Sequence, residues 1–96
     1  MQMDEADVSY DESHIQTCDG ILDDYLAAIA VASDRKESLL RVKQAVVRLN
    51  KLNASCGHEL IETDQREYLC DVIIRAAALT GFIEADSDVT EKWREW

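Results

Sequence analysis

The sequence predicts an all-α protein, folded as a small antiparallel bundle of three main helices plus a short C-terminal helix. Apolar residues recur at alternating steps of three and four in separate segments, which is the pattern of one buried helix face. The chain contains no proline and only three glycines, which disfavours turn-rich β folds. Its 96 residues, 47% of them apolar, fit a single globular domain.

The first helix is predicted to end near Ala32. Ser9 and Glu12 have the spacing of a capping box, whereas Gly20 weakens the pattern enough that the helix is expected to begin near Thr17. The apolar face consists of Ile15, Cys18, Leu22, Tyr25, Ile29 and Ala32, and the acidic flank beside it of Glu12, Gln16, Asp19 and Asp23.

The second helix is predicted over residues 35–52. Ser33 and Asp34 offer an N-cap, and Glu37 falls in the first turn, where a negative charge is favoured. Leu40 and Val47 lie off the main seam, so this helix is either packed on two sides or offers a second stripe to another chain. The main seam consists of Leu39, Val42, Val46 and Leu49, widened by Ala45 and Leu52.

Thr63 or Asp64 is predicted to cap the third helix, which is expected to stop at Thr80-Gly81. Phe82 and Ile83 are expected to fold back on the core. The buried face of this helix is predicted to consist of Leu69, Val72, Ile73, Ala76 and Leu79. The predicted short C-terminal helix is capped by Asp88 and Glu91 and carries Val89, Trp93 and Trp96 on one side.

Residues 1–8 are predicted to form a mobile acidic tail, and residues 9–96 a single helical domain. The longest apolar run, residues 25–32, is far below the roughly 20 residues that a membrane span needs. The N-terminus lacks the basic and apolar regions of a signal peptide, and three irregularly spaced cysteines do not suggest a disulfide framework. We therefore expect a cytoplasmic protein with reduced thiols.

The formal net charge is −10, and its distribution along the chain is uneven. Residues 1–34 carry nine acids and no base, residues 35–51 carry six bases and one acid, and residues 52–96 carry ten acids and four bases. The acidic flanks either neutralise the basic centre within the fold or leave carboxylates free for a basic protein. Such a charge disfavours nucleic acid and anionic membranes as partners.

The sequence offers weak candidates for chemistry, and we expect neither an enzyme nor a bound metal or cofactor. His14, Cys18, Cys56 and His58 have the ligand types of a zinc site, but neither half has the usual paired spacing. Cys56, His58 and Glu59 have the residue types of a nucleophilic set, yet residues two apart rarely reach that geometry.

Two further patterns have simple interpretations. The carboxylate pairs Asp23-Asp24 and Glu62-Asp64 fit a solvated helix face and a helix start. The basic stripe of Arg41, Arg48 and Lys51 lacks an aromatic platform beside it, so direct nucleic-acid binding is not expected.

The sequence therefore predicts a small acidic, non-enzymatic binding protein that engages, and inhibits or masks, a basic protein partner through its negative surface. The tryptophans serve either as partner contacts or as anchors of the terminal segment. The alternative is a structural or adaptor module that forms homo-oligomers through Leu40 and Val47 or through the tryptophans. The residues predicted to bind the partner are Asp23, Asp24, Glu59, Glu62, Asp64, Trp93 and Trp96.

Overall fold

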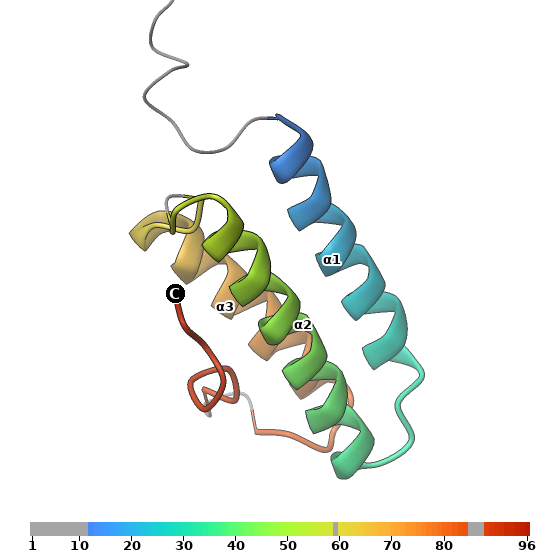
Figure 1. Ribbon diagram of the computed structural model, residues 1–96. Helices are drawn as coiled ribbons and strands as arrows, with labels where there is room; N and C mark the ends of the chain where they lie inside the picture. The colour runs from blue at the N-terminus through green and yellow to red at the C-terminus, as the bar shows by residue number, and fades with distance from the viewer. Residues whose placement is uncertain (1–11, 59, 85–87) are drawn as a thin grey trace, which may run out of the picture.

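The computed structural model of the chain describes residues 12–58, 60–84 and 88–96, and these form an all-helical bundle without β-strands. Its three helices are α1 (Glu12–Ala30), α2 (Arg35–Ser55) and α3 (Thr63–Leu79), shown in Figure 1. All three pack against one another, and α1 packs more extensively against α2 than either helix packs against α3. The predicted all-α class and three main helices are confirmed. The predicted tail at residues 1–8 lies outside the described residues.

Helix α1 is already helical at Glu12, so the prediction that Gly20 delays its start to Thr17 is wrong. A Cβ atom added at Gly20 would meet nothing within 4 Å, which places this glycine on an open part of the helix surface. The propensity cost of one exposed glycine, about 1 kcal/mol, is therefore outweighed by the packing of the apolar face. That face buries Ile21, Leu22, Tyr25 and Ile29.

The start of α2 confirms the predicted N-cap. The Asp34 carboxylate accepts a hydrogen bond of 2.7 Å from the backbone N–H of Glu37. In return, the Glu37 carboxylate accepts bonds from the backbone N–H and the hydroxyl of Ser33, at 3.2 and 2.9 Å. These two bonds from Ser33 are the main reason that the pKa of Glu37 lies below its ordinary value.

Helix α2 continues through Asn53 to Ser55, three residues beyond its predicted end. The buried Asn53 side chain accepts a 2.9 Å hydrogen bond from the backbone N–H of Ile61, and its backbone carbonyl accepts one of 2.8 Å from His58. The side-chain amide and backbone carbonyl of Asn53 therefore organise the connection to α3. Gly57 and His58 both adopt positive φ in this turn, at 66° and 64°.

The N-cap residue of α3 is Glu62, not Thr63 or Asp64 as predicted, and it forms no side-chain capping bond. It buries Leu69, Ile73 and Ala77, and the Tyr25 hydroxyl of α1 donates a buried 2.7 Å hydrogen bond to the Ile73 carbonyl. Burial raises the pKa of Tyr25, so this hydroxyl stays protonated and keeps donating. The bond fixes α3 against α1.

The end of α3 departs from the prediction at two residues, Leu79 and Phe82. Thr80 and Gly81 end the helix as predicted, with Gly81 at φ 82°. Ile83 folds back into the core, while Phe82 is 37% exposed. Leu79, predicted to lie on the buried face, is 88% exposed.

The predicted C-terminal helix is not confirmed. Residues 89–93 form turns, in which the backbone N–H groups of Trp93 and Arg94 both bond to the Thr90 carbonyl. The segment runs beside the bundle in Figure 1, and its Val89, Trp93 and Trp96 pack against the core. None of the helices in the described ranges is long and apolar enough to span a membrane.

Candidate protein-interaction surface

The acidic flank predicted on the first helix forms an exposed edge along α1. Glu12, Asp19 and Asp23 are all exposed, and α1 contains no Lys or Arg. Their spacings of seven and four residues place them on one side of the helix, beside the groove-facing positions 15, 22 and 26. We call these three carboxylates the α1 acidic edge.

A groove lies next to the α1 acidic edge, between α1 and α3. One hollow of about 240 Å³ is lined by Ile15 and Leu22 of α1, Leu60 and Ile61 of the connection, and Tyr68 and Leu69 of α3. Asp19 borders this hollow directly. We call this hollow, together with a second hollow farther along the same two helices, the α1/α3 groove.

The second hollow of the α1/α3 groove, of about 500 Å³, is lined by Leu26 and Ile29 of α1 and by Ala76, Leu79 and Phe82 of the α3 end. Leu26 is 40% exposed and Leu79 is 88% exposed. At the other end of the groove, Ile15 is 45% and Tyr68 is 63% exposed. Both hollows of the groove therefore present large apolar side chains to solvent.

The ion pairs that join two described residues neutralise only part of the acidic surface. They all use arginine, and the closest is the 2.8 Å contact between Arg75 and Asp71 on α3. Asp19 and Asp23 form no ion pair with any residue in the described ranges, and neither do Glu62 and Asp64. The pairs are Arg35–Glu84, Arg41–Glu37, Arg48–Asp24, Arg75–Asp71 and Arg94–Asp88.

The residues predicted to bind a partner fall into separate places. Asp23 belongs to the α1 acidic edge, whereas Asp24 faces α2 and pairs with Arg48 at 3.1 Å. Glu62 and Asp64 are exposed at the start of α3, next in sequence to the groove residue Ile61. Glu59 lies outside the described residues.

The tryptophans lie apart from the α1 acidic edge and are partly buried against the core. Trp93 borders two hollows over α2, one shared with Leu40 and the other with Val47. The second apolar stripe predicted on α2 is therefore partly covered by the chain's own C-terminal segment. Trp96 stacks against the Arg94 guanidinium, 5.5 Å from the ring centre.

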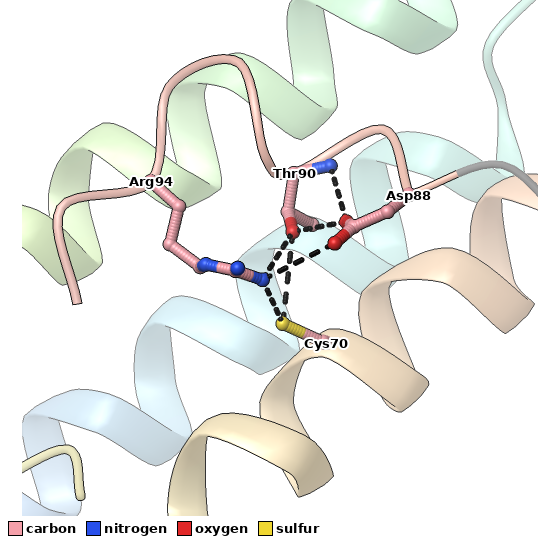
Figure 2. Close-up of polar contacts among 4 residues, drawn as sticks. All are labelled: Cys70, Asp88, Thr90 and Arg94. Carbon is pink, nitrogen blue, oxygen red and sulfur yellow. Dashed lines mark hydrogen bonds and ion pairs between the residues drawn. The ribbon is translucent and has the colours of Figure 1, made fainter. Parts of the chain in front are cut away.

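Two polar clusters hold the C-terminal segment in place. The Asn50 amide of α2 donates a 2.8 Å hydrogen bond to the Trp93 carbonyl and accepts one of 3.0 Å from the backbone N–H of Glu95. Figure 2 shows the second cluster, in which the Arg94 guanidinium reaches Asp88, Thr90 and Cys70 of α3.

In this second cluster, the fully buried Thr90 donates its hydroxyl to the Asp88 carboxylate at 2.5 Å, and Arg94 donates to the Cys70 sulfur at 2.8 Å. Burial by itself raises the pKa of Asp88, but the bonds from Thr90 and the charge of Arg94 outweigh it. They hold that pKa below its ordinary value. The cluster is a structural attachment of the segment to α3.

The expected candidates for chemistry do not assemble in the described part of the chain. No three His, Cys, Asp or Glu side chains gather there in a way that could hold a metal ion. Cys56 is fully buried in the core, while His58 is exposed in the turn that follows. Burial, followed by the charge of Asp19, raises the pKa of the Cys18 thiol, which keeps it protonated at neutral pH.

The predicted basic stripe is partly engaged within the fold. Arg41 contacts Glu37 and Gln44, and Arg48 contacts Asp24. Comparison of the chain with protein-family models, with curated proteins and with solved structures gave no match.

Sequence reasoning found the acidic side of the groove but missed its apolar floor. The spacing of Glu12, Asp19 and Asp23 is visible in the sequence, whereas Tyr68 and Leu79 read as ordinary members of a buried or amphipathic helix. The sequence feature that could have indicated the groove is the width of the apolar faces of α1 and α3. Each face is wider than the strip that two helices bury where they touch.

Proposed function

We propose that this protein is a small, acidic, non-enzymatic binding protein that engages a basic protein partner through the α1 acidic edge and the start of α3. The observation that carries the proposal is that Asp19, Asp23, Glu62 and Asp64 are exposed and unpaired within the described residues. Exposed carboxylates without an internal base attract Lys and Arg of a partner and accelerate association. Occupation of a basic surface would inhibit or mask it. A cytoplasmic setting is part of this proposal.

We further propose that the helices run as an antiparallel bundle. The connections at residues 31–34 and 56–62 are short, and short connections join helices that run in opposite directions. This arrangement gives a rigid support on which the acidic side chains keep their spacing.

The test is affinity capture with the full chain from native lysate, at about 0.05 M and about 0.5 M salt, read by mass spectrometry. Proteins retained only at low salt are then purified, and their binding is measured directly. The proposal expects basic proteins, captured strongly by the wild type and weakly by Asp19→Asn/Asp23→Asn. The matched control, Glu91→Gln/Glu95→Gln, removes two exposed carboxylates from the C-terminal segment instead of from α1, and should capture as the wild type does.

Self-association is the second candidate function, and the exposure of Leu40 on the second α2 stripe, at 47%, favours it. Native mass measured over a range of concentrations separates the two functions. A self-associating module gives oligomers whose share rises with concentration and falls in Leu40→Gln. Capture that is equal at both salt concentrations, or equal in both paired variants, would contradict the binding function.

A further inference from the structure

The α1/α3 groove has the dimensions and chemistry of a site for one helix. Its α1 side runs from Ile15 to Ala30, which is about 22 Å of helix, or about four turns. Its floor is apolar, and the side chains at its borders are exposed at both ends. Amphipathic helices bind such grooves by inserting apolar residues spaced three and four apart.

The charge beside the groove selects among amphipathic helices. Glu12, Asp19 and Asp23 follow its α1 side, and Asp64 lies in the first turn of α3, on the opposite side. Of the two arginines of α3, Arg75 is paired with Asp71 at 2.8 Å, and the half-buried Arg66 lines neither hollow of the groove. A helix in the groove would therefore lie beside carboxylates that no described base neutralises.

We infer that the α1/α3 groove binds an amphipathic helix of the partner, with its apolar face on the groove floor and Lys or Arg beside the α1 acidic edge. This inference rests on the proposed function and names the part of the partner that is recognised. A second copy of this chain fits less well, because each copy carries a net charge of −10. The chain's own residues 1–11, with four acids and no base, match the acidic edge no better.

The probe is a synthetic peptide of about 18 residues, made of leucine and lysine, whose leucines fall on one face when it is helical. A second peptide has the same composition, with the order permuted so that no face is apolar. Both carry a fluorophore, and fluorescence anisotropy against the full chain gives their Kd values. The helical peptide is expected to bind at least about tenfold more tightly than the permuted one.

The groove is tested with Leu26→Gln/Leu79→Gln, which makes two exposed groove residues polar without adding charge. The matched control is Val31→Gln/Leu40→Gln, because these residues are also exposed but line neither groove hollow. The groove variant should weaken binding of the helical peptide about tenfold, while the control should stay within about twofold of the wild type. Circular dichroism verifies that both variants keep their helix content.

A measurement without substitutions supports the same test. In ¹H–¹⁵N spectra of the wild type, the helical peptide should shift the amides of Ile15, Leu26, Tyr68 and Leu79, while those of Leu40 and Val47 stay in place. Equal binding of the two peptides, or shifts spread over the whole acidic surface, would overturn the groove but leave the proposed function standing.

Two other outcomes are equally decisive. If neither peptide binds at low salt, the proposed function fails together with the groove. If the groove variant abolishes a concentration-dependent dimer of the wild type without changing peptide binding, the occupant is a second copy, and the inference is wrong.

Discussion

At the scale of single residues, the Tyr25 hydroxyl is the clearest polar link between α1 and α3. Tyr25→Phe removes its buried 2.7 Å hydrogen bond to the Ile73 carbonyl and changes little else. We expect the free energy of unfolding to fall by about 1 kcal/mol, the typical net contribution of one such bond. Urea denaturation measures this change in the free energy of unfolding. Tyr68→Phe, at a position that is 63% exposed, is the control and should leave the midpoint unchanged.

The lowered pKa of Asp88 determines part of the pH dependence of the protein's stability. Because its pKa is lowered in the folded protein, its stabilising contribution is complete above the ordinary pKa of an aspartate, about 4. That contribution is lost as the pH falls through the lower folded-state value. Asp88→Asn should therefore lose less stability than the wild type between about pH 6 and about pH 2. Urea midpoints across this range test it, with the exposed Glu91→Gln as the control. Identical acid dependence of wild type and Asp88→Asn would refute the role given to Arg94 and Thr90.

At the scale of elements, the start of α2 depends on one side chain. Asp34→Ala removes the 2.7 Å capping bond to the Glu37 N–H and should cost about 1 kcal/mol of unfolding free energy. Asp34→Ser supplies another oxygen that can cap, and should recover most of the loss. Chemical denaturation of the three proteins compares them. A serine variant as unstable as the alanine variant would show that capping is not the cause.

The attachment of the C-terminal segment has a direct optical readout, because both tryptophans of the protein lie in it. Asn50→Ala removes the amide that bonds to Trp93 and Glu95. We expect red-shifted tryptophan emission and stronger quenching by acrylamide, with the three helices retained. Lys51→Ala, at the exposed neighbouring position, should behave as the wild type. Unchanged emission in Asn50→Ala would mean that the segment is held by its apolar contacts alone.

The helices themselves were accessible from the sequence, because periodicity and caps are local signals. The N-cap at Asp34 and the stop at Gly81 were both predicted, since each depends on a few adjacent residues. The role of Asn53 was not, because its partner Ile61 comes from the following connection. The exposure of Leu79 was also missed, since it depends on how far α3 stands from α1.

The same contrast applies to the candidate surface. The charge pattern left open whether the acidic residues of α1 pair with a base or stay unpaired. The sequence could not show in advance that Asp24 pairs with Arg48 while Asp23 stays unpaired among the described residues. Two adjacent acids point to different sides of a helix, and only the packing of α1 on α2 decides which one meets a base. The predicted short C-terminal helix is not confirmed, since residues 89–93 form turns that are attached through the side chains of Asn50 and Arg94, which sequence spacing does not reveal.

For the molecule as a whole, the carboxylates are neutralised unevenly over the surface. The ion pairs between described residues leave the α1 acidic edge and the start of α3 negative, beside an apolar groove. Charge alone gives fast, salt-sensitive association, whereas apolar contacts in the groove also require the partner to fit its shape. Together they describe a surface suited to a partner that is basic and amphipathic.

The most direct test of this account is the Kd of the purified partner at about 0.05 M and about 0.5 M salt, for the wild type and for Asp19→Asn/Asp23→Asn. For the wild type, we predict binding at least about tenfold weaker at the higher concentration, because screening weakens contacts between exposed charges. The variant should bind more weakly at low salt and respond less to added salt. A wild-type Kd that is the same at both concentrations, or unchanged by the two substitutions, would contradict the central claim.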